Sequence, residues 1–113
     1  MTDREMLELA AKAGGYARHE YVENSARDGR VVTGHYDSLL EVCINPLTDD
    51  GDALRLAVKL GIEVWRVPGK AMANGPHISP RISEPNGSDP YAATRRAIVR
   101  AAAEIGRQME ATK

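Results

Sequence analysis

The pattern of apolar and polar positions is clearest in the middle of the chain, after the turn signal Asn45-Pro46. Six apolar residues either follow the i, i+3, i+4, i+7 spacing of a helix face or widen that face: Ala53, Leu54, Leu56, Ala57, Val58 and Leu60. Thr48 or Asp49 is placed to cap this helix, and Gly61 is placed to end it in the left-handed conformation. The pattern therefore predicts a well-buried helix over 49–60.

Two further helices are predicted near the ends of the chain. Thr2-Asp3-Arg4-Glu5 is a capping-box pattern that precedes apolar residues at helical spacing, which indicates a helix over about 3–13. Asp89, or Ser88 before it, caps a last helix over about 90–110, with a proline at its favoured first position. We expect the core side of this last helix to carry Tyr91, Ile98, Ala102, Ile105 and Met109.

The remaining apolar segments alternate at the period of a strand. Residues 62–67 are the strongest of these, and the apolar groups on both of their faces predict a strand that is partly covered on each side. Asp28-Gly29 predicts a hairpin turn between strands near 16–22 and 30–34. Residues 39–44 fit either a short strand or an extended lead into the central turn.

The segment between the last strand signals and the final helix is rich in turn residues. Residues 70–77 contain Gly75-Pro76 and are predicted to form a loop. Residues 77–83 are predicted as an edge strand, because Pro80 has no backbone N–H to donate in a central strand. Three helices and a small antiparallel sheet favour an α+β fold, with the helices packed on one face of the sheet in a single domain over 1–113.

Composition limits both the core and the partner class. The chain has no Phe and one Trp, so its core must be built from smaller aliphatic residues and Met. Residues 1–60 hold seven Lys/Arg and eleven Asp/Glu, while residues 61–113 hold eight and five, and the net charge is −1. This mild separation of charge along the chain is as compatible with protein contacts as with nucleic acid.

The single Cys43 excludes an intramolecular disulfide, which fits a reducing cytoplasm. No signal segment or membrane-spanning apolar run is expected.

Two blocks of the sequence resemble a known group of proteins. Residues 45–62, NPLTDDGDALRLAVKLGI, and residues 89–102, DPYAATRRAIVRAA, look like a family of small phage and prophage proteins of unknown function. The same blocks are distantly similar to NinX-type phage proteins, and they cover roughly a third of the chain. The resemblance implies an accessory protein in the cytoplasm of a bacterial host, and it brings no catalytic residue with it.

Two sets of residues are candidates for metal binding. They are Asp49, Asp50 and Asp52, and His19, His35 and His77. The acidic set lacks the spacing of a calcium loop and is explained by capping and dipole compensation at a helix N-terminus. The histidines, even with Cys43, lack the spacing of a zinc site. We therefore expect no metal and no cofactor.

A hydrolase is the enzymatic alternative. The segment His35-Tyr36-Asp37-Ser38 contains base, acid and nucleophile side chains, but neighbours in sequence rarely converge on one site. Such an enzyme would need His35, Ser38 and a distant carboxylate in one pocket. In the absence of a recognisable catalytic set, we expect that the protein is not an enzyme.

Three arginines of the last predicted helix are the candidate nucleic-acid contact. Arg96, Arg100 and Arg107 fall on the side opposite the expected core, where they could contact phosphates in a salt-sensitive way. Glu104 and Glu110 lie near the same side and can pair with them, so a solvated, partly ion-paired face is the alternative interpretation.

Aromatic residues are the candidate anchors of a protein interface. Trp65 and Tyr36 are proposed for this role because Trp and Tyr dominate binding hot spots, although Trp65 and Tyr91 also fit a core in a chain without Phe. The first functional hypothesis is a non-enzymatic module that binds a host or phage protein. The second is a nucleic-acid-binding protein. A homodimer through a sheet edge or the last helix is compatible with either.

Overall fold

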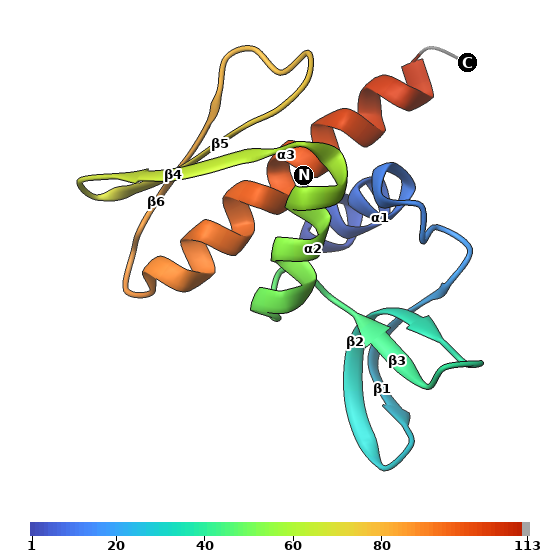
Figure 1. Cartoon of the computed structure of the whole chain (residues 1–113). Helices are drawn as coiled ribbons and strands as arrows, with labels where there is room; N and C mark the ends of the chain where they lie inside the picture. Colours follow the sequence, from blue (N-terminus) through green and yellow to red (C-terminus); the bar gives the residue numbers. More distant parts are fainter. Residues whose placement is uncertain (112–113) are drawn as a thin grey trace.

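The computed structural model describes residues 1–111, in which the chain forms three helices and six strands. The elements are α1 Asp3–Gly14, β1 Glu20–Arg27, β2 Arg30–Asp37, β3 Val42–Ile44, α2 Asp50–Leu60, β4 Glu63–Val67, β5 Lys70–Asn74, β6 Ile82–Pro85 and α3 Pro90–Ala111. The strands make two antiparallel sheets, sheet A in the order β1-β2-β3 and sheet B in the order β4-β5-β6 (Figure 1). The fold is α+β as predicted, with two small sheets in place of one.

The helix boundaries follow the local signals. Thr2 caps α1 reciprocally, since its hydroxyl accepts from the Glu5 N–H at 3.1 Å while the Glu5 carboxylate accepts from the Thr2 N–H at 3.1 Å. Asp49 caps α2, and Gly15 and Gly61 end the first two helices at φ 83° and 68°. The predicted ranges 3–13, 49–60 and 90–110 are therefore correct to within one residue at each end.

The core lies between the three helices and the inner face of sheet B. It is built largely from alanine, and its strand contribution comes from Ala71 and Ala73 of β5, which are fully buried beneath α3. Small side chains let the backbones approach closely. A Cβ atom placed on Gly106 of α3 would lie 2.1 Å from the Leu9 carbonyl oxygen of α1. The close approach of α1 to α3 therefore depends on the absence of a side chain at Gly106.

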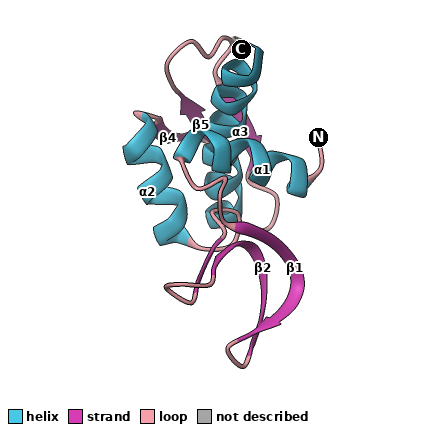
Figure 2. Cartoon of the chain, turned by 90° about the vertical axis from the view of Figure 1, so that its right-hand side faces the viewer, coloured by secondary structure: helices cyan, strands magenta, loops and turns pink. Residues whose placement is uncertain are grey.

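Sheet A projects away from this core as a curled hairpin with β3 along one edge (Figure 2). A bulge between Val22 and Ser25 interrupts the pairing of β1 with β2, and Asn24 adopts φ 47° there. Bulges bend a strand and increase its twist. Val22 and Tyr36 of this curled sheet are buried, although neither belongs to the core cluster of the helices and sheet B.

The loop predicted over 70–77 is wrong. Residues Lys70–Asn74 form β5, the central strand of sheet B, and the edge strand predicted over 77–83 begins only at Ile82. Alanine has a low propensity for strands, so the alternating Ala71 and Ala73 give only a weak strand signal. The turn signal Gly75-Pro76 is stronger and predicts a loop. Burial of Ala71 and Ala73 under α3 stabilises β5 where the local strand propensity does not.

The expected burial of four apolar side chains is also wrong, and one of them is Met109 of α3, which is 42% exposed. Leu54 and Val58 are 63% and 75% exposed, because α2 packs on α3 through its Ala53, Leu56 and Ala57 side only. Tyr91 is 71% exposed in the first turn of α3. Helical spacing identifies a face, but the width of the buried part depends on the neighbours.

Candidate functional site

Sheet B has one buried face and one open face. In the antiparallel pairing of β4 with β5, Val64 and Arg66 lie opposite Ala73 and Ala71 on the face toward α3. The other face carries three cross-strand pairs: Glu63 with Asn74, Trp65 with Met72, and Val67 with Lys70. The sequence predicted a strand partly covered on each side; in β4 four of the five residues are exposed and Trp65 is half-buried.

The open face contains a hollow of about 670 Å³ beside Trp65. It is lined by Glu63, Trp65, Asn74, Ile78, Ser79, Pro80 and Arg81. The Arg81 guanidinium carbon lies 6.0 Å from the centre of a Trp65 ring, at the outer range of a cation–π contact. Within residues 1–111 the Asn74 side-chain oxygen is buried without a hydrogen-bond partner. The hollow thus joins an aromatic wall to an acceptor in need of a donor.

Local sequence and one long side chain fix the direction of Trp65. Gly69 turns the chain from β4 into β5 at φ 79°, a conformation that glycine adopts without strain. Arg66 reaches the first turn of α3, where it donates to the Thr94 hydroxyl at 2.9 Å and to the Pro90 carbonyl at 3.4 Å. Because successive side chains of a strand point to opposite faces, anchoring Arg66 to α3 turns Trp65 outward.

Tyr36, the other aromatic residue proposed as an interface anchor, lies inside sheet A. It is 6% exposed, and its hydroxyl donates a hydrogen bond to the Asp28 carboxylate. That bond raises the pKa of Tyr36 to about 12. The bond ties Tyr36 of β2 to Asp28 in the turn between β1 and β2, whereas Trp65 lies in the other sheet.

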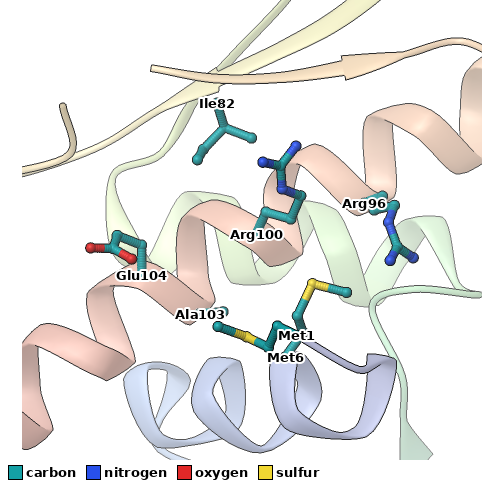
Figure 3. A pocket seen from close by; sticks show the side chains of 7 residues that line it. All are labelled: Met1, Met6, Ile82, Arg96, Arg100, Ala103 and Glu104. Carbon is teal, nitrogen blue, oxygen red and sulfur yellow. The ribbon is translucent and has the colours of Figure 1, made fainter. Parts of the chain in front are cut away.

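The three candidate arginines are all ion-paired. Arg100 donates to Glu84 at 2.8 Å and to the Ser83 carbonyl at 2.9 Å, while Arg96 donates to Asp3 at 3.0 Å. Arg96 and Arg100 line a hollow of about 440 Å³ between α1, α3 and β6 (Figure 3). Arg107 pairs with Glu104 one turn away on the same helix. The first two therefore tie β6 and the start of α1 to α3.

The residues of the hydrolase hypothesis lie in different environments. His35 is 4% exposed and packs between two aromatic rings, with centroid distances of 5.9 Å to Tyr16 and 5.3 Å to Tyr21. Ser38 is exposed in the loop that follows β2. The His35 imidazole is thus a packed side chain, and its Nδ1 atom has no hydrogen-bond partner within residues 1–111.

Burial of His35 predicts a loss of stability in mild acid. Desolvation lowers the pKa of His35 below its ordinary 6.5, with Glu8 opposing the shift. As pH falls below 6.5, the unfolded chain binds the proton first, so the free energy of unfolding decreases until pH reaches the lowered folded pKa. Urea midpoints at pH 7 and pH 5 should show a smaller drop for His35→Phe than for the natural chain. An equal drop in both proteins would contradict a buried neutral imidazole.

Most of the residues of the Trp65 hollow were not identified from the sequence. Asn74 fell in the segment predicted as a loop, and Arg81 in a segment predicted as a strand. The turn Pro68-Gly69 followed by alternating alanines is the signal that could have placed them.

Within the described part of the chain, no group of His, Cys, Asp or Glu side chains is arranged to hold a metal ion. None of the helices there is long and apolar enough to cross a membrane. No family model, curated protein or solved structure matches the chain.

Proposed function

We propose that the chain is a non-enzymatic module that binds another protein through the outer face of sheet B, with Trp65 as the anchor. The observation that carries this proposal is an outward-facing tryptophan beside a hollow of about 670 Å³. Interfaces are enriched in Trp, Met and Arg at their centres, and this face combines Trp65, Met72 and Arg81.

The chemistry of the hollow defines the partner segment. The Asn74 side-chain oxygen is buried and lacks a donor, so a partner N–H group that met it after the Asn74 side chain turned toward the hollow would remove an existing desolvation cost. An apolar side chain of the same partner would fill the space between Trp65 and Pro80. Glu63 and Arg81, both exposed, supply the polar rim. The resemblance to small phage and prophage proteins makes a host or phage protein the partner class that we propose.

Nucleic-acid binding by the last helix remains the second candidate, but it receives less support. A phosphate would have to compete with Glu84 for Arg96 and Arg100, and with Glu104 for Arg107. Phosphate contacts depend on available cations and weaken with salt. A protein partner could bind the outer face of sheet B without displacing these ion pairs.

The test compares the half-buried Trp65 of β4 with the exposed Tyr91 of α3. The tagged chain is used to capture partners from host and phage-infected lysates, with and without nuclease and at two salt concentrations. Trp65→Ala should weaken the affinity for a purified captured protein by about 30-fold, the scale of a hot-spot residue. Tyr91→Ala, which removes an exposed ring from α3, should leave that affinity unchanged.

The natural chain carries its own reporter for this experiment. Trp65 is the only tryptophan, so its fluorescence should change when a partner covers it. Equal losses from Trp65→Ala and Tyr91→Ala, or a complex that leaves the fluorescence unchanged, would contradict the proposal. Recovery of nucleic acid that dissociates at moderate salt would favour the second candidate.

A further inference from the structure

The outer edge of β4 is an unpaired strand edge. Sheet B runs in the order β4-β5-β6, so β4 pairs on one side only. No backbone hydrogen bond within residues 1–111 reaches β4 from its other side. The strand contains no proline, and its pairing with β5 is unbroken over Glu63–Val67. Natural sheets protect such edges with a bulge, a proline, a covering element or charged side chains, and of these β4 has only the charged Glu63 and Arg66.

The opposite edge of the same sheet is protected. β6 is four residues long and ends in Pro85, which has no N–H to donate. Arg100 of α3 donates a hydrogen bond to the Ser83 carbonyl at 2.9 Å. The contrast between the two edges marks β4 as the side on which a further strand can be added.

The sequence of β4 permits one antiparallel arrangement with a second copy that places no like charges opposite each other and needs no core residue. In a two-fold pairing the residues at a strand's centre meet their own copies, and opposite residues share a face. Centring on Arg66 would place two guanidinium groups opposite each other, which is unfavourable. Centring on Val64 would need Ile62, which is 7% exposed and already in the core. Centring on Trp65 uses all five residues.

We propose that two copies of the chain pair antiparallel through β4, centred on Trp65, so that two sheets of three strands become one of six. In this register each Trp65 lies opposite its copy, and Glu63 lies opposite Val67 of the second copy. Arg66 lies opposite Val64, with its guanidinium still held by α3. Both tryptophans then lie on the same outer face. The inference depends on the backbone edge and does not require the proposed protein partner.

Position 67 provides a sharp test of the register. Val67 is 38% exposed and faces Glu63 of the second copy in the proposed dimer, whereas Lys70 is its neighbour within one chain. Val67→Lys should tighten the dimer and Val67→Glu should weaken it, each by about fivefold at low salt, because both pairs occur twice. Within a single chain Val67→Glu should be the more stable of the two variants, because Lys70 attracts a glutamate at position 67 and repels a lysine there. The order expected for the dimer is the reverse.

The measurement is sedimentation of the purified full chain over a range of concentrations, with circular dichroism and thermal melting as the check on folding. The natural chain should sediment as a concentration-dependent dimer, and dimerisation should shift the fluorescence of its single tryptophan. Combining Glu63→Lys with Val67→Glu should restore the affinity that Val67→Glu loses. A natural chain that is monomeric at every concentration, or two Val67 variants that shift the dimer equally, would overturn the proposal. Neither result depends on capturing another protein.

Discussion

Replacing Gly106 by alanine should destabilise the protein by about 2 kcal/mol or more, although alanine is the better helix former by about 1 kcal/mol. The added Cβ would lie 2.1 Å from the Leu9 carbonyl oxygen and 2.8 Å from its carbon. Both are backbone atoms, so the clash can be relieved only by separating α1 from α3. That separation would open the alanine-rich core along the whole crossing.

Gly51→Ala is the matched control, because it makes the same substitution in the first turn of α2. The nearest atoms to a Cβ at Gly51 are the Arg55 guanidinium nitrogens, at 3.1 Å, and Oδ2 of Asp49, at 3.2 Å, all at the far ends of exposed side chains. Thermal melting should show a fall of about 10 °C for Gly106→Ala and almost no change for Gly51→Ala. Equal melting temperatures for the two variants would contradict the close α1–α3 crossing.

Gly34→Ala should open sheet A and leave the helical core folded. Gly34 has φ 141°, which L side chains rarely adopt, and a Cβ there would lie 2.4 Å from the Ile44 carbonyl oxygen. Backbone strain and the clash together should cost about 3 kcal/mol. Since sheet A projects from the molecule and its strand residues lie outside the main core cluster, the loss should appear as local opening.

Hydrogen exchange resolves this effect by segment, and Gly29→Ala supplies the comparison. Gly29 also has a positive φ, 77°, but a Cβ added there would meet no side chain or distant backbone atom within 4 Å. Amides of β1 to β3 should lose protection strongly in Gly34→Ala and slightly in Gly29→Ala, while those of α3 keep theirs in both. Uniform loss of protection over the whole chain would show that sheet A and the core unfold together.

The proposed interface and the proposed dimer occupy the same sheet for one physical reason. α3 covers only the inner face of sheet B, and Arg66 and Arg100 anchor β4 and β6 to that helix. The outer face is covered only in part, by the segment that contains Pro80 and Arg81, and no strand of residues 1–111 pairs with the β4 edge. In the six-stranded arrangement the two Trp65 hollows would lie on one continuous face, so a bivalent partner would bind more tightly than a monovalent one.

Much of the candidate site could not be predicted from the sequence. Trp65 itself was identified, because a lone tryptophan in a strand is conspicuous. Whether it pointed into the core or into solvent depended on Arg66 reaching α3, 28 residues away at Thr94. The arginine face was identified as well, but the pairing of Arg96 with Asp3 spans 93 residues. Local pattern contains no information on such contacts.

The sequence by itself determined the three helices, their caps and the α+β class, because capping oxygens, left-handed glycines and apolar spacing act within one or two turns. Tertiary structure alone decided that the strands form two sheets, that Lys70–Asn74 is a central strand, and that α1 and α3 touch at Gly106. These features depend on which surfaces meet across long sequence separations. Burial beneath α3 overrides the weak strand propensity of alanine there, and no local window of the sequence contains that energy.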